Sequence, residues 1–71
     1  MTQTTISKLK KGEFFTLKYF DDSEVEVPET LVWIRGDYDR SSKTYSCYKF
    51  EDVNHENFFK GSRACFTDIF F

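Results

Sequence analysis

The residues best suited to chemistry lie in one stretch that starts at Leu31 and ends at Phe50, where aromatic and cationic side chains alternate. Aromatic rings stack on nucleobases and cations meet phosphates, so this mixture is typical of a surface that binds single-stranded nucleic acid. The same mixture fills and solubilises a small β domain, with rings inside and cations at the rim. The sequence leaves both interpretations open. The candidate binding residues are Trp33, Arg35, Arg40, Lys43 and Tyr48.

Other reactive side chains are present, but their spacing does not match a known chemistry. A zinc site needs about four ligands, commonly with two cysteines two to four residues apart, whereas Cys47 and Cys65 are far apart. A nucleophilic Cys–His couple built on His55 would also need an orienting group and an oxyanion site. The carboxylates of residues 21–26 lack the glycine of a calcium loop. We therefore predict no catalytic residue, no metal, no cofactor and a non-enzymatic function.

Composition indicates one small domain with an aromatic core. The chain has 71 residues, of which 20% are aromatic and nine are Phe. Each buried ring removes roughly 150–250 Å² from water, so a few rings replace many aliphatic side chains. The formal net charge is −2, and residues 21–30 hold five carboxylates and no Lys or Arg. A general nucleic-acid binder is usually basic overall, so only a local basic patch fits that function.

The N-terminal residues, the length of the apolar runs and the two cysteines bear on localisation. Residues 1–12 are polar and contain no apolar core of a signal peptide. No apolar run approaches the roughly 20 residues that a membrane-spanning helix needs. Two cysteines in such a chain are expected to stay reduced and buried. We expect a cytoplasmic protein with no membrane partner.

The order of elements predicts a mostly β fold. Period-2 alternation of apolar residues favours strands over residues 13–20, 23–27, 31–38, 43–50 and 63–71. Residues 1–5 are expected to fray, and residues 6–71 to form a single domain. A helical turn over residues 6–12 would end at Gly12, and Gly36 is placed where a β-bulge would fit. Similar segments, Leu-Lys-Lys-Gly at 9–12 and Phe-Phe-Lys-Gly at 58–61, precede two of the strands.

One short helix is predicted between the last two strands. Asp52 can cap its N-terminus, the helix would run to Lys60, and Gly61 can be the residue after its end. Five short strands with tight turns indicate a small antiparallel barrel of SH3-like or OB-like type. An open meander packed on the short helix is the alternative.

Two segments carry a resemblance to known proteins. KLKKGEFFTLK at residues 8–18 and VWIRGDYDRSSKTYSCYKFEDVNHENFFKG at residues 32–61 resemble a group of small uncharacterised proteins from anaerobic gut bacteria and their phages and mobile elements. The resemblance covers most of the chain, and it implies a bacterial accessory protein with no known activity. Association with mobile DNA favours nucleic-acid binding slightly, by association alone.

The C-terminal sequence Ile69-Phe70-Phe71 offers a second way to bind. Three large apolar residues form either a clamped last strand or an exposed patch that associates with a partner. The partner is unknown from the sequence, and two interaction functions follow. One is single-stranded nucleic-acid binding through the stretch from Leu31 to Phe50. The other is protein binding or homodimer formation through an edge strand and surface aromatics.

Overall fold

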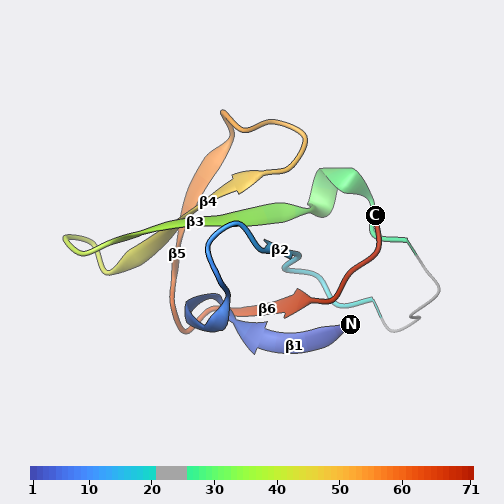
Figure 1. The fold of residues 1–71 in the computed structure, drawn as a ribbon, viewed down its shortest axis with the longest axis horizontal. Coiled ribbons are helices and arrows are strands. Elements are labelled where there is room, and N and C mark those ends of the chain that lie inside the picture. The colour runs from blue at the N-terminus through green and yellow to red at the C-terminus, as the bar shows by residue number, and fades with distance from the viewer. Residues whose placement is uncertain (21–25) are drawn as a thin grey trace.

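A computed structural model describes residues 1–20 and 26–71 and confirms the mostly β fold (Figure 1). Its strands form two antiparallel sheets, one with the order β2-β3-β4-β5 and one with β1 beside β6. Two three-residue 3₁₀ turns complete the described elements. The bounds are β1 Thr2–Thr5, η1 Ile6–Lys8, β2 Phe14–Phe15, η2 Glu29–Leu31, β3 Trp33–Asp39, β4 Thr44–Lys49, β5 Glu56–Lys60 and β6 Ala64–Thr67.

Backbone hydrogen bonds tie the two sheets together at two places. Thr16, directly after β2, forms an antiparallel bridge with Phe66 of β6. The second place is between η1 and the β5–β6 turn, where the Ile6 amide donates to the Arg63 carbonyl and the Ser7 amide to the Gly61 carbonyl, both at 3.1 Å. The described strands stay in two sheets rather than one closed barrel, so the SH3-like or OB-like barrel remains a prediction.

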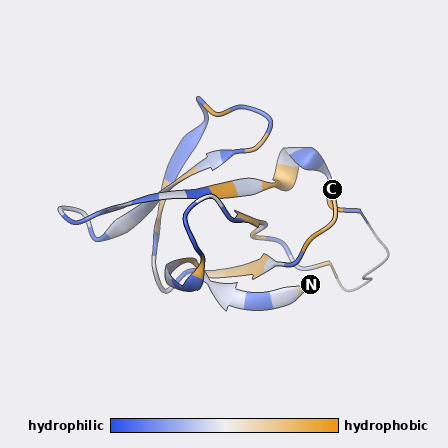
Figure 2. Cartoon of the chain, viewed as in Figure 1, coloured by the Kyte–Doolittle hydropathy of each residue, from blue (hydrophilic) through white to orange (hydrophobic). Residues whose placement is uncertain are grey.

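The core lies between the two sheets and is filled from both. Figure 2 shows hydrophobic segments in β2, in the first half of β3 and in β6, which face the middle of the molecule. Because successive side chains of a strand point to opposite faces, Trp33 and Cys47 on the paired strands β3 and β4 lie on the same inner face. The buried cluster consists of Ile6, Leu9, Phe15, Trp33, Cys47 and Cys65, with Leu17, Tyr45 and Phe59 packed against it.

The β-bulge predicted at Gly36 is confirmed. The register between β3 and β4 shifts between Arg35 and Tyr38. A Cβ atom at position 36 would lie 2.6 Å from the Ser46 carbonyl oxygen, so only glycine allows the two strands to approach this closely. Gly12 has a φ of 90°, which agrees with the predicted turn at that position.

The predicted helix from Asp52 to Lys60 is wrong. Asp52 does start a turn, because its carboxylate accepts a hydrogen bond from the Asn54 amide and its carbonyl accepts one from the His55 amide. The chain then forms β5, which pairs along its whole length with β4. A helix of so few residues is marginal in water, whereas this strand completes a ladder and places Phe59 in the core.

The strand boundaries differ from the prediction at both ends of the chain. Within the segment that was expected to fray, Thr2–Thr5 pair with β6 over four residues, and Thr favours extended backbone. The strand predicted over residues 13–20 is limited to Phe14–Phe15, and the last strand ends at Thr67 rather than at residue 71. Most of the strand predicted at 23–27 lies outside the described residues.

Candidate binding surfaces

Trp33 lies in the core rather than on the surface. Only 7% of the residue is exposed. Its ring makes edge contacts with Phe59 and His55, at centroid distances of 5.3 and 5.8 Å, and the Lys49 ammonium lies 4.8 Å from its centroid. The side chains of this chain already cover the indole, so Trp33 has no free face on which a nucleobase could stack.

Arg35 is held at the edge of the core by the bulge. Its Nη1 donates to the Gly36 carbonyl at 2.9 Å, and its guanidinium carbon lies 4.4 Å from the centroid of the Tyr45 ring. The buried Nε has no hydrogen-bond partner within the described residues. A guanidinium has five N–H donors. The bond to the Gly36 carbonyl fixes the position of the positive charge but satisfies only part of this set of donors.

Arg40 and Lys43 lie at the tip of the β3–β4 hairpin, and both are exposed. Lys43 adopts a φ of 57°, which allows the turn to close. The Asp39 carboxylate accepts hydrogen bonds from the Ser41 hydroxyl at 2.7 Å and the Ser41 amide at 3.0 Å. These bonds hold the pKa of Asp39 below its ordinary value, and they occupy the carboxylate locally, as turn chemistry predicts.

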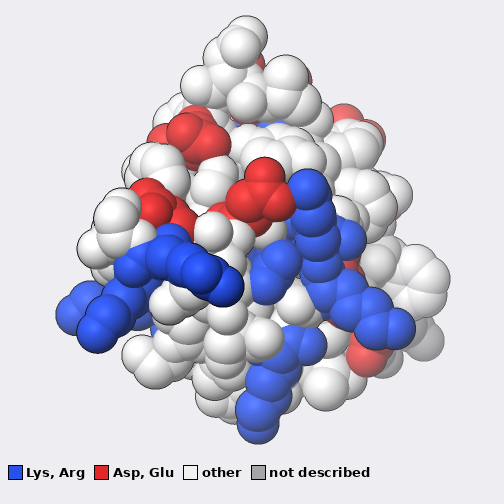
Figure 3. Space-filling model, turned by 60° about the vertical axis from the view of Figure 1, so that its left-hand side comes forward, with Lys and Arg blue, Asp and Glu red and all other residues white. Residues whose placement is uncertain are grey.

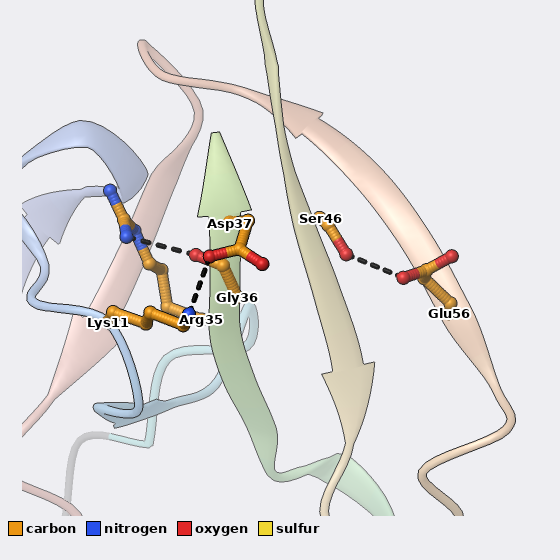
Figure 4. A network of polar contacts seen from close by, with 6 residues as sticks. All are labelled: Lys11, Arg35, Gly36, Asp37, Ser46 and Glu56. Carbon is orange, nitrogen blue, oxygen red and sulfur yellow. Dashed lines mark hydrogen bonds and ion pairs between the residues drawn. The ribbon is translucent and has the colours of Figure 1, made fainter. Parts of the chain in front are cut away.

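Tyr48 lies away from the other candidates. It is paired with Ile34 and with Glu56, on the outer face of the four-stranded sheet, whereas Trp33 and Arg35 belong to the inner face. On that outer face the Ser46 hydroxyl donates to the Glu56 carboxylate at 2.6 Å (Figure 4). The five predicted residues therefore do not form one site, and only Arg35, Arg40 and Lys43 belong to the same end of the molecule.

That end gathers cations from several segments of the chain. The loop after η1 reaches β3 through an ion pair of 2.7 Å between Lys11 and Asp37 (Figure 4). Lys60 of β5 is paired with Thr44, next to the hairpin tip. Figure 3, in which the hairpin end is turned toward the viewer, shows Lys and Arg side chains spread across this face. We call the cations of these contacting segments the basic end: Lys8, Lys10, Lys11, Arg35, Arg40, Lys43, Lys60 and Arg63.

Carboxylates also lie among the cations of this face, as Figure 3 shows. Asp37 is paired with Lys11; this bond lowers the pKa of Asp37 and raises that of Lys11. In the part of the chain that the structure describes, no other member of the basic end lies in an ion pair. The sequence prediction missed the cations of the η1 and β5–β6 segments. No local pattern in the sequence indicated them, because it is the Ser7–Gly61 hydrogen bond that brings η1 and the β5–β6 turn side by side.

A row of aromatic rings leads from the core to the hairpin tip. The Tyr45 ring, on which Arg35 lies, is 4.8 Å from the Tyr38 ring between centroids. Tyr38 is 47% exposed, in contrast to Trp33. Tyr38 was not among the predicted site residues, because the register shift at Gly36 decides which face its ring occupies. It is the exposed ring closest in sequence to Arg40.

A second surface lies around Phe71, away from the hairpin tip, and extends to Glu13, whose backbone bonds to Arg35 and Lys10 of the basic end. Its ring makes edge contacts with Phe14 and Phe50, at centroid distances of 5.2 and 5.0 Å. Two cavities border Phe71, one of about 250 Å³ and one of about 180 Å³, and each has two carboxylates in its lining. We call this surface the Phe71 groove; its lining residues are Glu13, Phe14, Glu26, Val27, Pro28, Glu29, Thr67, Asp68, Ile69 and Phe71.

The thiols are buried in the core. Cys47 and Cys65 are free and fully buried, as expected. Burial raises the pKa of Cys47, and burial together with the nearby Cys47 and Glu13 raises the pKa of Cys65 to about 11. Thiols of this kind are unreactive near neutral pH. Among residues 1–20 and 26–71, no three His, Cys, Asp or Glu side chains gather as a metal site would require.

Comparisons with protein-family models, with curated proteins and with solved structures found no match to this chain. Within the described residues, no helix has the length and apolarity needed to cross a membrane.

Proposed function

We propose that this chain is a non-enzymatic binding module that holds single-stranded nucleic acid on its basic end. The hairpin tip, with Arg40 and Lys43, would meet the phosphates, and Tyr38 would stack on a base. Trp33 has no part in this site because it is buried. Tyr48 has none either, because it lies on the outer face of the sheet.

The observation that carries the proposal is the uneven distribution of charge over a molecule whose net charge is negative. Eight of the ten Lys and Arg residues belong to the basic end, where Lys11 is paired with Asp37 and the ionised Asp39 is the neighbour of Arg40. Within the described residues no other cation of this end lies in an ion pair, so these cations remain available to phosphates. A local basic surface of this kind supplies the salt-dependent part of nucleic-acid affinity.

Exposed aromatic groups favour single strands over a duplex. Stacking of one base on an aromatic side chain contributes about 1–3 kcal/mol, and it requires an unpaired base. The exposed Tyr38 ring continues the row that Arg35 and Tyr45 begin. A base on Tyr38 would leave its phosphate near the cations of the tip.

Binding is expected to be modest and sensitive to salt. For single strands, log K falls with log salt at a slope of about −0.7 for each phosphate neutralised. Contact with about four phosphates would give a slope near −3. The acidic groups elsewhere on the chain would repel additional length of the strand, so the site is expected to be short.

The test is fluorescence anisotropy with a labelled oligothymidylate of about 16 nucleotides, in the size range of known single-strand sites. Lys43→Glu should abolish binding at low salt, and Tyr38→Ala should weaken it about 5-fold or more. Lys18→Glu is the matched control, since it makes the same change of charge outside the basic end and should bind nearly as the wild type does.

A second ligand separates base stacking from simple attraction of charges. Heparin has no bases, so Tyr38→Ala should leave its affinity unchanged while Lys43→Glu weakens it. Equal loss of oligothymidylate binding in Lys43→Glu and Lys18→Glu would refute the basic end as the site. Absence of binding by the wild type at low salt would refute the function itself.

Two finer expectations remain proposals beside this one. The Thr16–Phe66 bridge and the hydrogen bonds between η1 and the β5–β6 turn support an arrangement of the sheets like an opened small barrel of SH3-like or OB-like type. The resemblance to proteins of gut bacteria and their mobile elements supports a cytoplasmic bacterial origin.

A further inference from the structure

We propose that the Phe71 groove binds the β3–β4 hairpin of a second copy of this chain, so that copies associate head to tail. This inference does not rest on nucleic-acid binding, because it uses only the shape and charge of the two ends.

The two ends are complementary in charge and in polarity. The groove combines the rings of Phe14 and Phe71 with the carboxylates of Glu26 and Glu29. The carboxylates of Glu26 and Glu29 accept no hydrogen bond from any of the described residues. The hairpin tip presents Arg40 and Lys43, whose aliphatic stems can lie on rings while their charges meet carboxylates.

The other two carboxylates of the groove are already held in place. Glu13 accepts hydrogen bonds from the Lys10 amide at 3.0 Å and the Thr67 hydroxyl at 2.9 Å. Asp68 accepts a hydrogen bond from the Thr2 hydroxyl at 2.7 Å. These neutral donors keep the negative charge in position without cancelling it. One cavity beside Phe71 thus holds two fixed charges, and the other holds two carboxylates that have no hydrogen bond within the described residues.

The size of the cavities favours side chains over a small molecule. Pockets for drug-sized ligands are usually roughly 300–1,000 Å³, whereas the two cavities beside Phe71 are about 250 and 180 Å³. Each can accept one long side chain. Two cavities that share Phe71 in their lining fit a narrow hairpin that presents two cations.

The shape of the molecule requires the hairpin to come from another copy. The hairpin tip and the C-terminal segment lie at opposite ends of the longest axis, as Figure 1 shows. The extents are 39 × 23 × 16 Å, so the hairpin cannot fold back onto its own groove. Two different surfaces meet in such a contact, and repeated head to tail it forms a ring where its rotation closes and an open chain where it does not.

The association is expected to be weak, with a Kd on the order of 0.1–1 mM, because exposed ion pairs contribute little each. The test is the mass from sedimentation equilibrium over a range reaching about 1 mM, on protein freed of nucleic acid by nuclease treatment. The weight-average mass of the wild type should rise steadily with concentration and pass that of two chains.

Two variants each remove one half of the contact. Arg40→Ser with Lys43→Ser neutralises the hairpin, and Glu29→Lys reverses the charge of the groove. Each variant alone should stay monomeric at about 1 mM, the concentration of a weak contact. Lys18→Ser and Glu56→Lys are controls outside both surfaces and should associate as the wild type does. A dispersed amide spectrum confirms that each variant is folded.

An equal mixture of the two variants gives the decisive result. The variant with Arg40→Ser and Lys43→Ser has an intact groove, which can accept the intact hairpin of the Glu29→Lys variant. The substituted hairpin of the first and the substituted groove of the second cannot bind a further copy. The mass should therefore stop at two chains. A monomeric wild type, association that survives Glu29→Lys, or a mixture that grows past two chains would each overturn the proposal.

Discussion

Truncation of Trp33 measures how much of this small fold depends on one ring. About nine-tenths of the side chain is buried, and it lies against Phe59, His55 and Lys49. A buried aromatic removes roughly 150–250 Å² from water, which at about 25 cal/mol per Å² corresponds to about 4–6 kcal/mol. Measured truncations of buried aromatics cost about 3–5 kcal/mol. We expect Trp33→Ala to lose about 4 kcal/mol of the free energy of unfolding.

That loss is large for a chain of 71 residues. At about 0.05–0.15 kcal/mol per residue, the total free energy of unfolding would be roughly 4–11 kcal/mol. The Ala variant is therefore expected to be partly or wholly unfolded at 25 °C. Trp33→Phe keeps a ring beside Phe59 and should lose only about 1–2 kcal/mol, which keeps the comparison measurable.

Urea unfolding followed by circular dichroism and by fluorescence tests this reasoning. Trp33 is the only tryptophan, so the emission reports on it alone. We expect blue-shifted emission that iodide quenches weakly, and a red shift on unfolding. Val53→Ala is the control, because Val53 is 65% exposed and should change stability little. An Ala variant within about 0.5 kcal/mol of the wild type, the range of surface changes, would refute the burial of Trp33.

Three further results follow from local contacts. Gly36→Ala should destabilise the fold by about 1–3 kcal/mol, measured by urea unfolding, because the new Cβ would lie 2.6 Å from the Ser46 carbonyl oxygen; a more stable variant would contradict this close approach. The Cys65 thiol has an ordinary pKa of 9.0, and folding raises this value to about 11. Between these values the unfolded chain binds fewer protons than the folded one, so stability should fall by about 1–2 kcal/mol as pH rises from 9 to 11. Cys65→Ala should lose less over the same range, and an equal pH slope would exclude this thiol as the cause. Lys11→Ala should leave the urea midpoint unchanged, because the ion pair with Asp37 is exposed; a clear shift would mean that the pair is structural.

The central part of the fold could be predicted from the sequence because its signals are local. Alternation of apolar residues in residues 31–38 and 43–50 fixes two paired strands, and both are observed with small changes of boundary. The bulge at Gly36 was also predictable, since a glycine inside a strand marks a close approach of backbone. The turn at Gly12 follows from the same kind of information.

The errors arise where a segment depends on a distant partner. Residues 56–60 are compatible with a short helix by local preference, but pairing with β4 decides for a strand. Residues 2–5 have no large apolar side chain to anchor them in a core, and it is pairing with β6 that makes them a strand. The burial of Trp33 likewise depends on Phe59, which the helix prediction had removed from the sheet.

The candidate surfaces were harder to predict than the fold because each is assembled from several segments. Arg40 and Lys43 lie three positions apart in the sequence and were identified. The cations of η1 and of the β5–β6 turn join them only through hydrogen bonds such as that between Ser7 and Gly61. The Phe71 groove unites residues 13–14, 26–29 and 67–71, and no local pattern indicates that these ranges meet.

The hairpin tip links the two proposals, and this link has a physical consequence. Arg40 and Lys43 cannot meet phosphates and the carboxylates of a second copy at the same time. A nucleic-acid strand has a denser line of negative charge than the four carboxylates of the Phe71 groove. Nucleic acid should therefore displace a second copy from the hairpin. We expect copies to associate head to tail only in the absence of nucleic acid, and the protein that has bound nucleic acid to be a monomer.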